Sequence, residues 1–189
     1  GPNNKQKRLE IYEEYKKNRA AMPEDLYLQL AKVLDYCRFR GLPVLQEEGV
    51  EADDIIGSIT LWAKEQGSNV FVISSDKDLC QLIDDKTKLL HLHKGNKVID
   101  TEDVVQLFGV KPEQIVDYLA IAGDSADNIP GIPGFGPKTS ATLLNEFGSI
   151  DNLLASIDQV KNPKWQEKIT THKETLLMSK QLASLHLDE

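Results

Sequence analysis

The sequence predicts an α/β fold that passes into an all-helical C-terminal part. Residues 70–73 form a continuous apolar, largely β-branched run, which is typical of a strand buried in a parallel-type sheet. Residues 52–66, just before this run, have the apolar spacing of an amphipathic helix. From residue 101 onward every segment has helical periodicity, and no linker interrupts the chain. We therefore expect one compact unit over residues 1–189.

Four elements are expected before the buried strand. Residues 9–15 and 23–40 have helical patterns, and the second of them places its apolar residues at helical spacing. Residues 42–45 form a short apolar run that predicts a neighbouring strand. The helix over 52–66 is expected to end at Gly67, because glycine commonly terminates helices.

After the strand, expected over 69–75, the sequence predicts a hairpin and then helices. The hairpin joins 88–93 to 97–99 through Gly95-Asn96, a dipeptide suited to a tight turn. The expected helices cover 101–108, 112–122, 137–147, 150–156 and about 163–185. Only one strand reads as fully buried, and residues 1–4 contain no initiating Met, so we expect the chain to begin part-way through its domain.

The composition excludes a membrane-spanning protein, since no apolar run approaches the ~20 residues that cross a bilayer. The net charge of −8 is unevenly distributed, because residues 1–40 hold nine Lys/Arg against six Asp/Glu and so carry +3, which leaves −11 for the remainder. Bound divalent cations would offset part of that acidity. Cys37 and Cys80 lack zinc-site spacing, and we expect reduced thiols.

Acidic side chains form three clusters at the boundaries of expected elements. They are Glu51, Asp53 and Asp54; Asp76 and Asp78; and Asp124 and Asp127. Crowded carboxylates repel one another, and hard cations such as Mg²⁺ or Mn²⁺ would compensate them. Taken singly, the clusters also fit a charged helix N-terminus, a helix cap and a turn. Three of them in one chain favour a shared metal site.

A glycine-rich segment lies between two expected helices. It reads Gly131-Ile132-Pro133-Gly134-Phe135-Gly136-Pro137-Lys138-Thr139. Its glycines allow close approach to the backbone, and the second proline suits the first turn of a helix. The exposed amides of that turn, with a lysine or threonine side chain, would hold a phosphate in the manner of a helix-hairpin-helix, which contacts nucleic acid without reading base sequence. The alternative is an ordinary Pro/Gly turn.

The order of these motifs resembles the 5′-nuclease family. The matching segments are Tyr15-Lys16-Lys17-Asn18-Arg19, Gly49-Val50-Glu51-Ala52-Asp53-Asp54, Ser75-Asp76-Lys77-Asp78, Gly123-Asp124-Ser125-Ala126-Asp127-Asn128 and Gly131-Ile132-Pro133-Gly134-Phe135-Gly136. The family includes phage 5′-exonucleases, flap endonucleases and the nuclease domain of bacterial DNA polymerase I, to which this chain is most similar. The resemblance implies a PIN-like domain with a parallel-type sheet, in which residues 1–127 are the α/β catalytic part, with a helical arch near 9–40. Residues 128–189 would be a helical DNA-binding lobe, with a helix-hairpin-helix near 128–147.

The resemblance also implies an activity and a role for each motif. The activity is metal-dependent 5′→3′ exonuclease and flap-endonuclease cleavage of DNA and RNA primers, with two Mg²⁺ or Mn²⁺ ions. The implied ligands are Glu51, Asp53 and Asp54 at the first ion and Asp76, Asp78, Asp124 and Asp127 at the second. Lys16 and Arg19 would be catalytic at the scissile phosphate, and Tyr15 would stack on a base. The remaining implied DNA contacts are Lys17, Gly131, Gly134, Gly136, Lys138 and Thr139, with K⁺ at the hairpin.

The implied partners are branched or nicked duplex DNA with a 5′ single strand and the polymerase domain of the same parent chain. The implied location is the bacterial cytoplasm, at the nucleoid, without a membrane partner. Complete family members carry two further upstream aspartates that this sequence lacks, so we expect the 189-residue chain alone to be a weak nuclease. The alternative is a DNA-structure binding module without catalysis, which would need no divalent ion. A single-metal phosphatase is disfavoured, because no nucleophile-bearing motif is present.

Overall fold

A computed structural model describes residues 5–187, apart from the side chain of Lys94. The expectations about residues 1–4 and the last two residues therefore lie outside the described part. The α-helices are α1 (Gln6–Ile11), α2 (Glu24–Phe39), α3 (Ala52–Glu65), α4 (Thr101–Phe108), α5 (Ile115–Ala122), α6 (Pro137–Phe147), α7 (Ile150–Ala155), α8 (Pro163–Thr171) and α9 (Lys173–Ala183). The strands are β1 (Val70–Ile73), β2 (Thr87–His91) and β3 (Lys97–Ile99). Short 3₁₀ helices are η1 (Asp78–Leu82), η2 (Leu92–Lys94), η3 (Pro112–Gln114) and η4 (Ile157–Gln159).

The sheet is small and mixed. Strand β1 pairs in parallel with β2, and β2 pairs antiparallel with β3 through the predicted turn, where Gly95 and Asn96 have φ values of 68° and 58°. The strand expected at 69–75 is present, but it is not buried on both faces. Phe71 and Ile73 are 59% and 62% exposed, because they lie on one face of the strand and only the other face, which carries the buried Val72, meets the core.

Residues 42–45 do not form the expected strand. They follow α2 as irregular chain, and Leu42 and Leu45 are 55% and 59% exposed. A strand requires a hydrogen-bonding partner along its length, and within the described residues the sheet contains only β1, β2 and β3. The apolar run therefore predicted the wrong structure.

The N-terminal segment differs from the helix expected over 9–15. Helix α1 ends at Ile11, and the chain then turns so that the amide of Lys16 donates to the carbonyl oxygen of Asp127 at 2.9 Å. The side chain of Asn128 donates to the carbonyl oxygen of Glu14 at 2.6 Å. These tertiary hydrogen bonds replace helical ones and hold residues 14–16 against the loop after α5.

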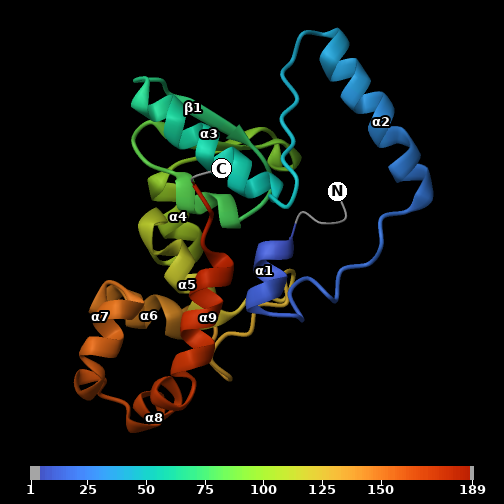
Figure 1. Ribbon diagram of the computed structural model, residues 1–189. Coiled ribbons are helices and arrows are strands. Elements are labelled where there is room, and N and C mark those ends of the chain that lie inside the picture. Colours follow the sequence, from blue (N-terminus) through green and yellow to red (C-terminus); the bar gives the residue numbers. More distant parts are fainter. Residues whose placement is uncertain (1–4, 188–189) are drawn as a thin grey trace.

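Helix α2 matches the helix expected over 23–40, yet it stands apart from the rest of the molecule (Figure 1). None of its residues is buried. Its apolar side chains at helical spacing therefore do not face the core, although that spacing predicted the helix correctly. Cys37 on α2 and the buried Cys80 are both free thiols, as expected.

In the structure the helical lobe comprises α5 to α9 and thus begins earlier than the residue 128 expected from the sequence. It is built around α5, which packs against both α6 and α9 (Figure 1). The helix expected over about 163–185 is two helices, α8 and α9, separated at His172. The break lets Ile169 and Leu176, both fully buried, enter the same core from two directions. No helix among residues 5–187 is long and apolar enough to cross a membrane.

Candidate functional site

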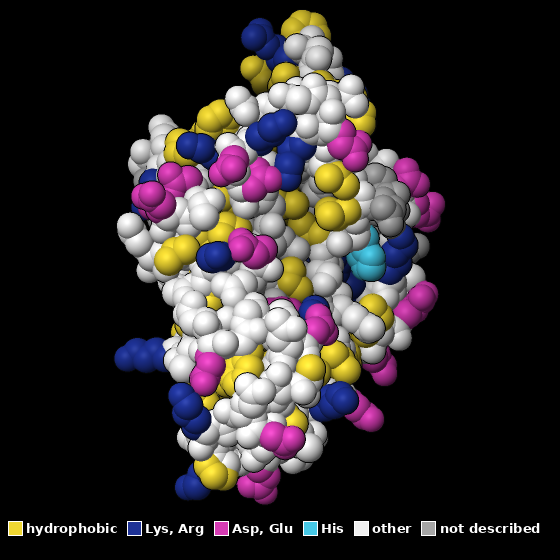
Figure 2. All heavy atoms as spheres, turned by 90° about the vertical axis from the view of Figure 1, so that its left-hand side faces the viewer, with side chains coloured by type: hydrophobic (Ala, Val, Ile, Leu, Met, Phe, Trp, Pro, Cys, Tyr) yellow, Lys and Arg dark blue, Asp and Glu magenta, His cyan; other side chains and the backbone are white. Residues whose placement is uncertain are grey.

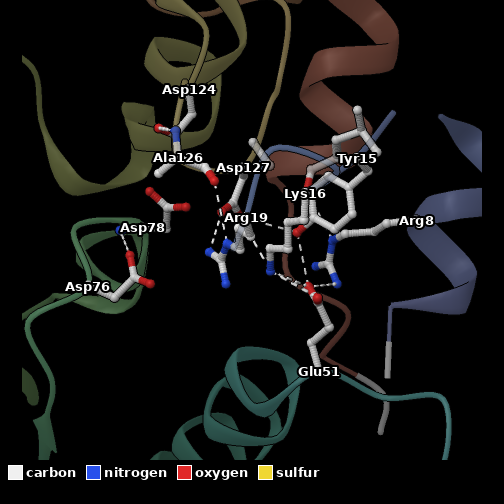
Figure 3. A network of polar contacts seen from close by, with 12 residues as sticks. Arg8, Tyr15, Lys16, Arg19, Glu51, Asp76, Asp78, Asp124, Ala126 and Asp127 are labelled. Atoms are coloured by element: carbon white, nitrogen blue, oxygen red, sulfur yellow. Dashed lines mark hydrogen bonds and ion pairs between the residues drawn. The ribbon is translucent and has the colours of Figure 1, made fainter. Parts of the chain in front are cut away.

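Three carboxylates meet where the sheet and the helical lobe face each other. Asp78 begins η1, shortly after β1, whereas Asp124 and Asp127 lie in the loop after α5 (Figure 3). That loop is closed by two backbone hydrogen bonds between Asp124 and Ile129, of 2.9 and 2.8 Å. Each of the three carboxylates offers an oxygen within 4.8 Å of the others. The structure thus brings together three of the four side chains expected at the second ion.

The chemistry of this centre fits a hard divalent cation. The donors are all carboxylate oxygens, the ligands that Mg²⁺ and Mn²⁺ prefer. The Oδ1 atom of Asp78 is buried, and no described residue hydrogen-bonds to it. Burial, followed by the charges of Asp76 and Asp124, raises the pKa of Asp78 to about 7. A bound cation would satisfy this oxygen and favour its charged form.

Asp76 and Asp53 lie beside the centre. Asp76 lines a cavity of about 450 Å³ with Asp78, Asp124 and Asp127, and its Oδ1 accepts from the amide of Asp78 at 3.0 Å. Burial, and then the charge of Asp76, raise the pKa of Asp53. The first and second acidic clusters of the sequence are therefore electrostatically coupled, as a shared site requires.

Glu51 accepts hydrogen bonds from cationic and hydroxyl groups. Lys16 Nζ lies 2.9 and 3.0 Å from its two oxygens, and Tyr15 Oη lies 3.0 Å away (Figure 3). The same ammonium is 3.4 Å from Asp127, so Lys16 links Glu51 to the three-carboxylate centre. Tyr15 is 2% exposed, and its pKa is raised by burial and by Glu51. Its ring is therefore not available to stack on a base, which corrects the role expected for it.

Asp54, expected at the first ion, is paired with Arg8 instead. Its oxygens accept from the two terminal nitrogens of Arg8 at 2.8 Å each, and Oδ1 also accepts from the amide of His186 at 2.9 Å. Burial alone would raise the pKa of Asp54, but hydrogen bonds from Arg8 and His186 hold it below its ordinary value. The structure therefore gives Asp54 a structural ion pair.

Arg8, which no sequence motif marked, organises this part of the molecule. It is 4% exposed, and besides Asp54 it donates to Glu51 at 3.1 Å and to the carbonyl oxygens of Leu182 and Ser184 at 3.0 and 2.8 Å. Burial alone would lower its pKa, but the hydrogen bonds and charge of Asp54 raise it. Arg8 thus joins α1, the start of α3 and the segment after α9.

Two further cations reach the acidic centre. Arg19 forms an ion pair with Asp127, so it lies beside the acidic centre, where the sequence analysis expected it. Lys77 Nζ donates to Asp124 Oδ1 at 2.7 Å. Sequence reasoning assigned no role to Lys77, although its position between Asp76 and Asp78 was a signal. Lys17, in contrast, is exposed and pairs with Glu14.

The glycines of the hairpin segment serve different purposes. A Cβ atom on Gly131 would lie 2.3 Å from the backbone nitrogen of Gly123, so this glycine is required by packing within the protein. Gly134 has a φ of +79°, which glycine adopts without strain. A Cβ atom on Gly136 would meet nothing within 4 Å, so the backbone there is open to an approaching molecule. Lys138, in the first turn of α6, is exposed, and Thr139 is half-buried.

The raised pKa of Asp78 gives a pH-dependent prediction for the protein in EDTA. Between the ordinary value of 3.8 and about 7 the folded state holds a proton that the unfolded state releases, so stability falls as pH rises through this window. Asp78→Asn should therefore raise the free energy of unfolding at pH 8 by about 1–3 kcal/mol, and by less at pH 5. Urea unfolding at both values tests this, with the exposed Asp85→Asn as control. A gain that is equal at both pH values would contradict it.

Two family models together match the whole described chain. The model for the 5′-3′ exonuclease N-terminal resolvase-like domain matches residues 2–109, and that for the 5′-3′ exonuclease C-terminal SAM fold matches residues 110–189. The first match contains the sheet, and the second contains helices α5 to α9. The chain belongs to the 5′-3′ exonuclease family. Its models meet at residues 109 and 110, whereas the division expected from the sequence lies at 127 and 128.

Similarity to individual proteins supports this membership. DNA polymerase I of Rhizobium leguminosarum is 41% identical over 181 residues, and the 5′-3′ exonuclease of Buchnera aphidicola subsp. Acyrthosiphon pisum is 35% identical over 187 residues. Each alignment covers 96% of this chain but only 18% and 65% of the relative's length, respectively. The T5 D15 protein, co-crystallised with metal ions, is 27% identical with a TM-score of 0.79, over 97% of this chain and 72% of that one.

Proposed function

We propose that this chain is the nuclease part of a divalent-metal-dependent 5′ nuclease. It would hydrolyse phosphodiester bonds in branched or nicked duplex DNA with a 5′ single strand, and in RNA primers. The observation that carries the proposal is the convergence of Asp78, Asp124 and Asp127, with a buried Asp78 oxygen that has no other described partner. A D15 flap endonuclease of bacteriophage T5, 27% identical with a TM-score of 0.79, is known in a pseudo-enzyme-product complex with DNA and metal ions.

The acidic residues divide into two proposed ligand groups. Asp76, Asp78, Asp124 and Asp127 would hold one ion, and Glu51 and Asp53 would contribute to the other. Asp54 is left out because Arg8 occupies both of its oxygens. Bound Mg²⁺ or Mn²⁺ would activate the attacking water and offset charge on the leaving oxygen.

The cations around the centre would act on the substrate. Lys16 and Arg19 are held beside Asp127 by ion pairs. From there they would supply positive charge to the scissile phosphate as negative charge develops on it. The segment containing them leads into α2, which stands away from the core and would flank the 5′ single strand as an arch (Figure 1). Lys17, which is exposed, would contact the same strand.

The hairpin would hold the duplex. Gly136 is open to solvent and precedes the free amides of Lys138 and Thr139 at the start of α6, an arrangement that suits a backbone phosphate. Gly131 and Gly134 would shape the turn, and K⁺ would bind its carbonyl groups. We further propose that the parent protein works at the bacterial nucleoid in the cytoplasm, with a polymerase domain in the same chain.

A cleavage assay tests this proposal. With protein in excess over a labelled 5′-flap duplex, we expect slow cleavage near the flap junction with Mg²⁺ or Mn²⁺ and none in EDTA. Asp124→Asn should reduce the rate about 10- to 100-fold, because the centre loses a charged ligand. The exposed Asp85→Asn serves as the matched control. Cleavage that persists in EDTA, or an unchanged rate for Asp124→Asn, would contradict the proposal. Binding without any cleavage would favour a DNA-structure binding module.

A further inference from the structure

Lys168 on α8 reaches over the tip of the hairpin. Its Nζ donates to the carbonyl oxygen of Pro133 at 2.7 Å and lies 5.8 Å from the centre of the Phe135 ring. A Cβ atom added at Gly134 would lie only 2.7 Å from this ammonium. The ring of Trp165, one turn earlier on α8, packs against Phe135 with centroids 5.9 Å apart. Helix α8 is therefore fixed against the hairpin so that a positive charge lies at its tip.

The charge of Lys168 has no acidic counterpart among the described residues. Within the described lobe, Lys161 pairs with Glu146 at 3.6 Å and Lys180 pairs with Asp117 and Asp151, whereas Lys138, Lys164 and Lys173 resemble Lys168 in forming no ion pair. Lys168 differs from these three because its ammonium is held at the hairpin by the carbonyl oxygen of Pro133. Pro133 takes one of the three ammonium hydrogens, which leaves donors for a further acceptor. The protein is acidic overall, and Figure 2 shows basic side chains interspersed with acidic ones on the face drawn there. Because no acidic side chain neutralises it, the ammonium of Lys168 keeps its charge for an anionic ligand.

We propose that Lys168 is a DNA-binding residue that contacts one backbone phosphate of duplex DNA beside the hairpin. This inference rests on the proposed DNA binding and adds a contact from α8, outside the glycine-rich segment itself. The carbonyl oxygen of Pro133 holds the ammonium at the hairpin tip, so little side-chain entropy is lost when the phosphate binds. The amides at the start of α6 would bind a second backbone phosphate of the same duplex.

The test is the salt dependence of binding to a 5′-flap duplex in EDTA, measured by fluorescence anisotropy over a series of KCl concentrations. Each phosphate neutralised by a cation contributes about 0.9 to the slope of log K against log salt. Lys168→Gln should therefore reduce the slope by about 0.9 and weaken binding about 3- to 10-fold at low salt. Lys168→Arg, which keeps the charge, should restore the slope.

Lys161→Gln is the matched control, because it removes the same charge from the same lobe at a lysine that is paired with Glu146. Its slope should equal that of the wild type. If Lys168 only supports the hairpin, Lys168→Gln would lower affinity without changing the slope, and the inference would be overturned. An equal loss of slope in Lys161→Gln would overturn it too. A wild-type chain that fails to bind the flap duplex would instead contradict the proposed function, and with it this inference.

Discussion

Arg8→Gln is expected to lower the free energy of unfolding by about 3–5 kcal/mol, the cost of breaking a buried ion pair by removing one partner. The guanidinium donates to both oxygens of Asp54 and to the carbonyl oxygens of Leu182 and Ser184, at a position only 4% exposed. Glutamine is shorter and neutral, so Asp54 would stay buried with its charge unpaired. The segment after α9 would lose its attachment to α1 and α3.

Urea unfolding at neutral pH measures this loss. Arg38→Gln is the matched control, because Arg38 forms an exposed ion pair with Asp35 and should change stability by less than about 0.5 kcal/mol. Adding Asp54→Asn to Arg8→Gln should recover part of the loss, since it removes the unpaired charge. Hydrogen exchange at the amide of His186, which donates to Asp54, should accelerate in Arg8→Gln. A loss below about 1 kcal/mol would show that this network does not stabilise the fold.

Local features of the fold could be predicted from the sequence because their causes are local. The turn at Gly95-Asn96 needs two residues that tolerate positive φ, and both adopt it. Helix α4 begins where Asp100 and Asp103 form a capping box and ends at Gly109, with a φ of +73°. The helix over 163–185 was predicted without its break at His172, because the apolar periodicity continues across the break. The break is needed only so that α8 and α9 can both pack against the same core.

Long-range contacts decided what the sequence could not show. Acidic residues in the first turn of a helix look alike, whether they face a metal site or an arginine far away in the chain. The charge of Asp76 helps to raise the pKa of Asp53, whereas Asp54 pairs with Arg8, which lies 46 residues earlier. Tyr15 likewise leaves the expected helix because the loop after α5, more than a hundred residues later, binds its neighbours. The motif order nevertheless identified the residues that converge, since Asp78, Asp124 and Asp127 were all predicted as ligands.

The second large effect is expected from Asp124→Asn on metal binding. Asp124 is 3% exposed and shares the centre with Asp78 and Asp127, so its charge is a large part of the attraction for a cation. Asparagine keeps the shape and one oxygen but removes the charge. We expect Mn²⁺ affinity to fall about 10- to 100-fold, the range found when groups that support a metal site are lost. Lys77 would also lose its acidic partner, which adds positive charge that is no longer paired.

Titration calorimetry with Mn²⁺ tests the central claim most directly, because it does not depend on cleavage. The wild-type chain and Asp85→Asn should bind Mn²⁺ saturably and with equal affinity, and Mg²⁺ should compete. Asp124→Asn should bind Mn²⁺ about 10- to 100-fold more weakly. If the wild type shows no saturable binding, or if Asp124→Asn binds as tightly as the wild type, then the three carboxylates are not a metal centre and the proposed nuclease mechanism is wrong.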